Sequence, residues 1–224
     1  MFTRATFDFL ADLAANNERA WFEANKARYE ELVREPALDF IAAMAPELAR
    51  FAPNFRAEAK KMGGSLMRVY RDTRFARDKT PYKTNVGIQF RHSLGKDVHG
   101  PGFYVHIANE ECFLGVGCWH PEPEALGRIR DLVAAKPQKW FKARDDKKFA
   151  AHWALSGERL SRPPRGYAAD HPAAEDLKYK DFVAMASLDF DEVVGPGFVK
   201  LASARFAAAA PFMGFLCEAL GVNL

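Results

Sequence analysis

Apolar residues at helical spacing dominate the first fifty residues of the chain. Phe7, Leu10 and Leu13 form one stripe, and a second stripe begins after Asn16 and Asn17. Its members are Trp21, Phe22, Tyr29, Leu32 and Val33. Residues at these spacings share one face of an α-helix, so the pattern predicts helices over 3–51 that need a surface to pack on. Pro36 suits the first turn of a later helix, because the N–H that proline lacks would have no partner there.

From Leu66 onward the apolar period changes from helical to two. The pattern predicts strands at 66–71, 86–91, 103–108 and 111–119, the last two joined by a short link as in a hairpin. Side chains alternate between the two faces of a strand. We therefore expect an antiparallel sheet with one apolar face.

Helical spacing returns after Pro121, at Leu126, Ile129, Leu132 and Val133. A loop-rich stretch from Ser156 to about Leu177 follows, and 198–220 reads as a closing helix broken near Pro211. The order of elements predicts an α+β fold in a single domain, 1–224. That domain is expected to be helical over 1–52, mainly strand over 60–119, and helical and loop-rich over 121–224.

Composition places the chain in a reducing compartment. Its 224 residues are 49% hydrophobic, which is enough for one sizeable core. The three cysteines contain no C-x-x-C pair, so we predict no disulfide framework and a cytoplasmic location. Asp8 and Asp12 interrupt the N-terminal apolar stretch, and the longest uncharged run, 206–217, is too short to span a bilayer. We expect no membrane association and a monomer or weak oligomer.

Charge is concentrated in one segment, although the net charge is only +3. Nine Lys or Arg residues and three acidic residues lie between 56 and 84, so the positive field is local. The densest part, 68–84, reads RVYRDTRFARDKTPYKT. Arginine offers a planar fork of donors that matches carboxylate or phosphate oxygens, and lysine adds a mobile point charge. The segment is therefore a candidate site for an anionic small molecule.

The candidate ligand-binding residues fall into two groups. The cations expected to hold the anion are Arg68, Arg71, Arg74, Lys79 and Lys83, and Asp72 and Asp78 are expected to orient them, with Tyr82 and Arg91 beside them. Alternation along a strand at 66–71 would place Arg68 and Arg71 on opposite faces, so a turn at Asp78–Pro81 must bring some cations back.

This segment resembles the RxxRDxRFxxDKxPYK signature of a domain family of unknown function found in bacteria and fungi. The matching residues are Arg68, Arg71, Asp72, Arg74, Phe75, Asp78, Lys79, Pro81, Tyr82 and Lys83. An N-terminal pattern of that family, NN-x-x-x-WF-x-x-NK-x-x-Y, is matched by Asn16, Asn17, Trp21, Phe22, Asn25, Lys26 and Tyr29. The similarity extends over nearly the whole chain, to the region of Gly117 and Trp119. It implies a relative but no activity, substrate or catalytic residue.

Three interpretations of the basic segment remain open. It is a structural ion-pair and turn network, a pocket for an anion or phosphoester, or an exposed face for nucleic acid or protein. Structural charge networks also collect Arg and Asp, and basic patches with aromatic rings also bind nucleic acids. A nucleic-acid-binding module would use Tyr70, Tyr82 and Trp119 as stacking rings.

Two residues of the predicted sheet are candidates for proton transfer. His106 lies beside Tyr104 on the strand face opposite Phe103 and Val105, and that face is continuous with Arg91 on the preceding strand. Histidine titrates near neutral pH, so this pair is the catalytic candidate if it faces the basic segment. A lone histidine on a sheet is more often simply hydrogen-bonded.

Motifs for metals, cofactors and common nucleophiles are absent. Cys112, Cys118 and His120 lack the compact fourth ligand of a zinc site, so we predict no metal. Gly115 and Gly117 do not make a dinucleotide fingerprint, and we predict no cofactor and a close approach of backbone or ring at these glycines. The leading hypothesis is an enzyme or binding protein for a phosphorylated or carboxylated small molecule. Alternatives are a nucleic-acid-binding module and a structural protein with no ligand.

Overall fold

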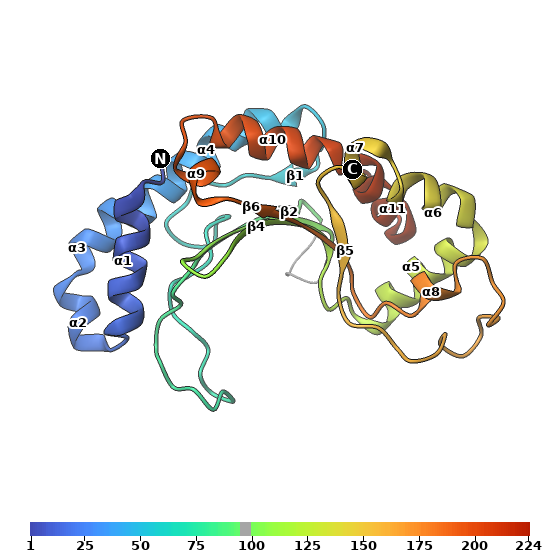
Figure 1. Ribbon diagram of the computed structural model, residues 1–224, viewed down its shortest axis with the longest axis horizontal. Helices are drawn as coiled ribbons and strands as arrows, with labels where there is room; N and C mark the ends of the chain where they lie inside the picture. The colour runs from blue at the N-terminus through green and yellow to red at the C-terminus, as the bar shows by residue number, and fades with distance from the viewer. Residues whose placement is uncertain (95–99) are drawn as a thin grey trace.

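The computed structural model describes residues 1–94 and 100–224, and over these residues the chain forms a six-stranded antiparallel sheet with helices (Figure 1). The strands are β1 (Phe55–Arg56), β2 (Val86–His92), β3 (Gly102–Ile107), β4 (Cys112–Cys118), β5 (Ala154–Ser156) and β6 (Phe182–Leu188). Their spatial order is β1-β2-β3-β4-β6-β5. The predicted α+β class and antiparallel sheet are confirmed.

Helices precede, interrupt and follow the sheet. Those before it are α1 (Arg4–Ala15), α2 (Arg19–Ala24), α3 (Lys26–Tyr29), the π-helical turn η1 (Glu30–Arg34) and α4 (Glu35–Ala49). The later ones are α5 (Pro123–Ala135), α6 (Pro137–Arg144), α7 (Lys147–Ala150), α8 (Ala174–Leu177), α9 (Phe190–Val194), α10 (Phe198–Ala208) and α11 (Ala210–Leu220). The stripe of Phe7, Leu10 and Leu13 is buried as predicted, and Pro36 lies in the first turn of α4.

One face of the sheet is covered by helices and carries the core. Figure 1 shows the sheet as an arch with α4 and α10 over its outer side. Val86, Ile88 and Phe90 on β2 pair with Ile107, Val105 and Phe103 on β3, and all six side chains are buried. Because side chains alternate along a strand, the residues between them face the other side of the arch. That inner face has no helix layer over β2 and β3 in Figure 1 and is called the open face below.

Strand β6 was not predicted, because its region was expected to be helical and loop-rich. It pairs with β4 over seven residues, from Cys112↔Leu188 to Cys118↔Phe182, and so completes the middle of the sheet. Its sequence, FVAMASL, is rich in Ala, Met and Leu, which favour helices. Burial between β4 and β5 overrides that preference, since the sheet supplies both neighbours.

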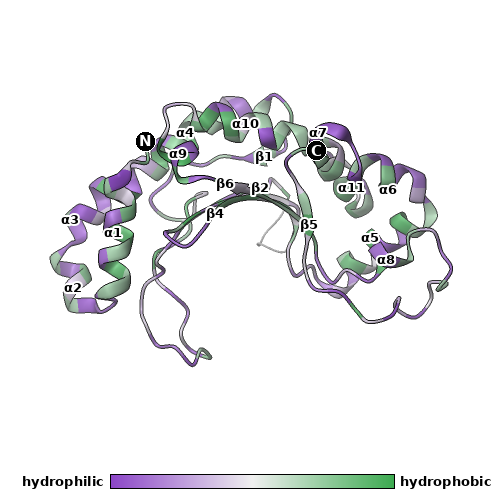
Figure 2. Cartoon of the chain, viewed as in Figure 1, coloured by the Kyte–Doolittle hydropathy of each residue, from purple (hydrophilic) through white to green (hydrophobic). Residues whose placement is uncertain are grey.

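The signature segment forms an arm, defined as residues 65–85, that projects from the sheet on the side away from α4 and α10 (Figure 1). Its two limbs are joined by backbone hydrogen bonds, Lys83 N to Val69 O at 2.7 Å and Arg71 N to Pro81 O at 2.9 Å. The strand predicted at 66–71 is wrong, because this limb makes isolated bridges at Leu66 and Tyr70 instead of a continuous ladder. Its outer part is largely hydrophilic in Figure 2.

The closing helix is broken where the proline predicted it. Helix α10 ends at Ala208 and α11 begins at Ala210, with Pro211 in its first turn. Among the described residues, no single helix has the length and apolarity of a membrane span; α10 and α11 reach them only as a pair, and they meet at a bend of 54°.

Candidate functional site

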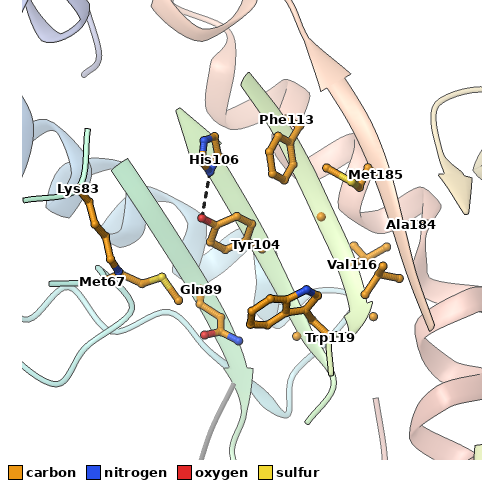
Figure 3. Close-up of a pocket in the computed structure, with 14 residues that line it drawn as sticks. Met67, Lys83, Gln89, Tyr104, His106, Phe113, Val116, Trp119, Ala184 and Met185 are labelled. Atoms are coloured by element: carbon orange, nitrogen blue, oxygen red, sulfur yellow. Dashed lines mark hydrogen bonds between the residues drawn. The ribbon is translucent and has the colours of Figure 1, made fainter. Parts of the chain in front are cut away.

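A cavity of about 490 Å³ lies on the open face and is called the open-face cavity (Figure 3). Its lining residues come from the arm and from strands β2, β3, β4 and β6: Met67, Lys83, Gln89, Gly102, Tyr104, His106, Phe113, Gly115, Val116, Gly117, Trp119, Val183, Ala184 and Met185. Most of these side chains are apolar or absent. The polar groups are few and gather on β2, β3 and the arm, as in sites for small molecules.

Glycines create the hollow in an otherwise regular sheet. Gly102, Gly115 and Gly117 occupy open-face positions on β3 and β4 where larger side chains would fill the space. Gly117 has φ +120°, and a Cβ there would lie 2.0 Å from the carbonyl oxygen of Phe182. No other residue fits that position without moving β6. The close approach predicted for the Gly115 and Gly117 pair is therefore confirmed at Gly117.

Tyr104 and His106 meet inside the open-face cavity. The Tyr104 hydroxyl lies 3.1 Å from His106 Nδ1, and the imidazole stacks on Phe113 with ring centroids 4.7 Å apart (Figure 3). Burial raises the pKa of Tyr104 to about 12, opposed by a hydrogen bond from Asn85. Burial also lowers the pKa of His106, opposed by the charges of the two neighbouring glutamates. At neutral pH the pair is therefore a phenol and a neutral imidazole, joined by a hydrogen bond between the hydroxyl and Nδ1.

Lys83 brings a positive charge to the same cavity. It stands at the base of the arm with Met67, and Figure 3 shows both side chains beside β2. The ammonium group is half-buried and makes no hydrogen bond or ion pair with any residue that the structure describes. Burial lowers the pKa of Lys83, and the nearby charge of Arg68 lowers it further. Lys83 is thus a cation without a counterion at the edge of an apolar hollow.

Gln89 was not predicted as a site residue, yet it lies at the centre of the open face. It is paired in register with Tyr104, and only 9% of its surface is exposed. Its Oε1 is buried and accepts no hydrogen bond from the described part of the chain. The alternation of β2 does indicate that Gln89 shares a face with Arg91, but sequence alone does not reveal that its amide lacks a partner.

Two other cations of the signature, Arg71 and Arg74, pair with carboxylates of the arm itself. Arg71 bonds the Asp78 carboxylate and the Thr80 hydroxyl, and Arg74 binds Asp72 through Nε at 3.0 Å and a terminal nitrogen at 2.7 Å. Hydrogen bonds from these arginines lower the pKa of Asp72 and of Asp78 to about 2 in each case.

These contacts form a local network in which each of the two aspartates pairs with one arginine. Lys79 donates to the Thr73 carbonyl at 2.8 Å, and Arg68 is exposed. The residues of this arm network, Arg68, Arg71, Asp72, Arg74, Asp78 and Lys79, do not line the open-face cavity. The structure therefore separates them from Lys83, Tyr104 and His106, with which the sequence had grouped them.

Tyr82 is placed in the core and not at a surface. It is 1% exposed and stacks on Phe22 with ring centroids 4.1 Å apart. The Asn17 side chain makes two hydrogen bonds to the backbone of Tyr82: it donates to the carbonyl at 2.9 Å and accepts from the N–H at 3.0 Å. The N-terminal pattern and the signature thus meet in space, and they fix the root of the arm.

Arg91 lies in a smaller hollow next to the open-face cavity, called the arginine hollow, of about 170 Å³. Its lining residues are Arg56, Glu58, Gly63, Gly64, Ser65, Gln89, Arg91, His92 and Ser93. Gln89 lines both hollows, so they adjoin along β2. His92 is structurally committed, because its Nε2 lies 2.8 Å from the Asn223 carbonyl and its Nδ1 accepts from the Leu94 N–H.

The residues that the sequence offered as metal candidates were Cys112, Cys118 and His120. All three cysteines are free, and burial raises the pKa of Cys118 and Cys217. No group of three or more His, Cys, Asp or Glu side chains in residues 1–94 and 100–224 is placed to hold a metal ion. His120, at φ 46°, is held by the buried carboxylate of Asp181, which accepts from its backbone N–H at 2.5 Å and lies 3.0 Å from Nδ1.

The fold and the site define an α+β protein with a ligand-sized cavity on the uncovered face of its sheet. The chain belongs to the family of conserved hypothetical proteins DUF2461, which matches residues 5–215. A comparison with curated proteins finds no match.

Proposed function

We propose that this protein is a cytoplasmic enzyme or binding protein for a small molecule that has an apolar body and a carboxylate or phosphate group. The observation that carries the proposal is Lys83, a half-buried cation without a counterion among the described residues, at the edge of the open-face cavity. The volume of about 490 Å³ is within the usual range for small-molecule sites.

The electrostatics of the cavity favour an anion over a neutral ligand. Desolvating a charge without a partner costs free energy, and an anionic ligand would offset that cost by pairing with Lys83. Apolar walls from Met67, Phe113 and Met185 would bury the body of the ligand. The anion thus supplies specificity and the body supplies affinity.

Tyr104 and His106 are the proton-transfer pair in this proposal. In the tautomer whose Nδ1 accepts from the Tyr104 hydroxyl, Nε2 carries the ring proton and is the donor available to a ligand. A phenol with a pKa of about 12 is a weak acid at neutral pH, so Tyr104 would orient the ring, and the imidazole would exchange the proton with the ligand.

The nucleic-acid alternative has less support. Of its three stacking rings, Tyr82 is buried against Phe22, and the arginines Arg71 and Arg74 are held by aspartates. Paired cations neutralise fewer phosphates. Binding of single-stranded nucleic acid that weakens log-linearly with salt over several counterions would favour this alternative.

A thermal-unfolding experiment with 3-phenylpropionate and the neutral 3-phenylpropanol tests the proposal. We expect a saturable rise in Tm with the carboxylate, of about 3 to 6 °C at ten times its Kd, and a smaller rise with the alcohol. Lys83→Met should remove most of the difference between the two compounds.

Lys79→Met is the matched control, because it removes the same charge from the same arm but outside the cavity. It should respond like the parent. The proposal is wrong if the parent shows no saturable shift with the carboxylate, or if Lys79→Met and Lys83→Met lose the response equally.

A further inference from the structure

The arginine hollow contains a like-charge pair that the fold itself does not neutralise. Arg56 on β1 and Arg91 on β2 are direct cross-strand partners, and both line the hollow. Like charges placed opposite each other destabilise a sheet. Neither guanidinium group makes an ion pair or side-chain hydrogen bond with the residues that the structure describes.

Among the described residues that line the hollow, the one carboxylate does not neutralise these two arginines. Glu58 forms an ion pair with Lys60, Oε1 to Nζ at 3.1 Å, so its negative charge is already neutralised by that lysine. The described lining of the hollow therefore keeps a net positive charge. The cross-strand register places the two arginines next to each other on the wall of the hollow, Arg56 exposed and Arg91 partly buried. Planar guanidinium groups at such a site offer donors that suit the oxygens of a tetrahedral oxyanion.

A second, independent feature points to a ligand at the same place. Gln89 is nine-tenths buried between the arginine hollow and the open-face cavity, and its Oε1 has no donor within the described residues. An unpaired buried acceptor costs free energy, and rotation of the Gln89 amide toward the hollow would let a hydroxyl or N–H of a ligand offset that cost.

The loop that carries Gly63 and Gly64 also lines the hollow, and its backbone packs closely against the backbone of Glu58. Gly63 has φ +70°, and a Cβ on Gly64 would lie 2.4 Å from the Glu58 carbonyl oxygen. Ser65 ties the loop to β1, accepting from the Glu58 N–H at 3.0 Å and donating to the Arg56 carbonyl at 3.2 Å. The glycines therefore allow a small, fixed wall facing Arg56 and Arg91.

We propose that the arginine hollow is a phosphoryl subsite in which Arg56 and Arg91 bind one phosphate group and Gln89 Oε1 accepts from a neighbouring hydroxyl of the same ligand. This narrows the ligand to a phosphorylated, hydroxyl-bearing molecule whose apolar body reaches the open-face cavity and carries there a second anionic group that pairs with Lys83. That an apolar body occupies the open-face cavity rests on the proposed function. The phosphoryl subsite is argued independently of it.

Inorganic phosphate is the probe that tests the subsite alone. At constant ionic strength, set with chloride, the Tm of the parent should rise saturably with phosphate by about 3 to 6 °C at ten times its Kd. Arg56→Met and Arg91→Met should each lose this shift, and Arg91→Lys should lose most of it because the planar fork is gone. Arg77→Met, which removes an exposed arginine of the arm, is the matched control and should keep the shift.

The variants also separate a ligand site from a structural role. Removing either partner of the like-charge pair should leave the Tm without phosphate unchanged or higher, since repulsion is relieved. Lys83→Met should keep the phosphate response while losing the response to 3-phenylpropionate, so the two proposals fail separately. The subsite is refuted if phosphate gives the parent no shift beyond the chloride control, or if Arg56→Met and Arg91→Met respond as the parent does.

Discussion

At the residue scale, Lys83 is the side chain whose surroundings most differ from those of its neighbours. Lys79 and Lys83 stand four positions apart on one arm, but Lys79 bonds a backbone carbonyl in solvent whereas Lys83 is half-buried without a partner. Sequence predicted both as ligands of one anion. The two lysines differ in their surroundings because the arm returns to β2 at its base, where Lys83 lies.

The depressed pKa of Lys83 makes stability depend on pH. The unfolded chain binds a proton at this position up to its ordinary pKa of 10.5, and the folded protein loses that proton earlier. The unfolded state therefore holds more protons between the two pKa values, so the free energy of unfolding rises with pH in that interval. Lys83→Met should remove this rise, and Lys79→Met should retain it.

Urea denaturation of the parent and both variants, from neutral pH to the region of 10.5, measures this dependence. The parent should gain stability relative to Lys83→Met as the pH increases. A difference between parent and Lys83→Met that stays constant with pH would mean that Lys83 titrates as a solvated lysine.

At the element scale, one of two adjoining asparagines, Asn17, holds the arm at its root. Asn17 makes two hydrogen bonds to the backbone of Tyr82, while the exposed Asn16 bonds only the Asp12 carbonyl at the end of α1. Loss of Asn17 would leave two partly buried backbone groups without partners. We expect Asn17→Ala to lower the free energy of unfolding by about 2 to 4 kcal/mol.

Asn16→Ala is the matched control and should cost less than about 1 kcal/mol, because water replaces its exposed bond. The denaturant midpoints of the two variants decide the point. Equal midpoints would show that the grip of Asn17 on Tyr82 contributes nothing to stability.

The sequence predicted the strands in which apolar and polar residues alternate, because one face of each is buried. It missed the strand whose conformation depends on pairing with neighbouring strands. Alternation identified β2, β3 and β4, and it placed Tyr104 and His106 on the face of Arg91, as the register confirms. It missed β6, whose Ala- and Met-rich sequence becomes a strand only between β4 and β5. It also read the arm as one anion site, since pairs such as Arg71 and Asp78 depend on how the loop closes.

At the scale of the whole molecule, the layout of the helices decides where a ligand can bind. Helices from both ends of the chain cover one face of the sheet, and the core lies there. The opposite face is left with glycines at the positions that hollow it, between the base of the arm and β6. The open-face cavity is thus a product of topology, assembled from segments more than one hundred residues apart in sequence.

The six methionines of the chain provide the most direct test that this cavity is the ligand site. Met67 and Met185 line it from opposite sides, on the arm and on β6, whereas Met44 and Met213 are fully buried in helices. The measurement is the NMR spectrum of the protein with ¹³C-labelled methionine methyl groups during a titration with 3-phenylpropionate. The methyl signals of Met67 and Met185 should shift together and saturate, while those of Met44 and Met213 stay in place. Unmoved signals for Met67 and Met185 at concentrations that stabilise the protein would contradict the assignment of the open-face cavity as the binding site.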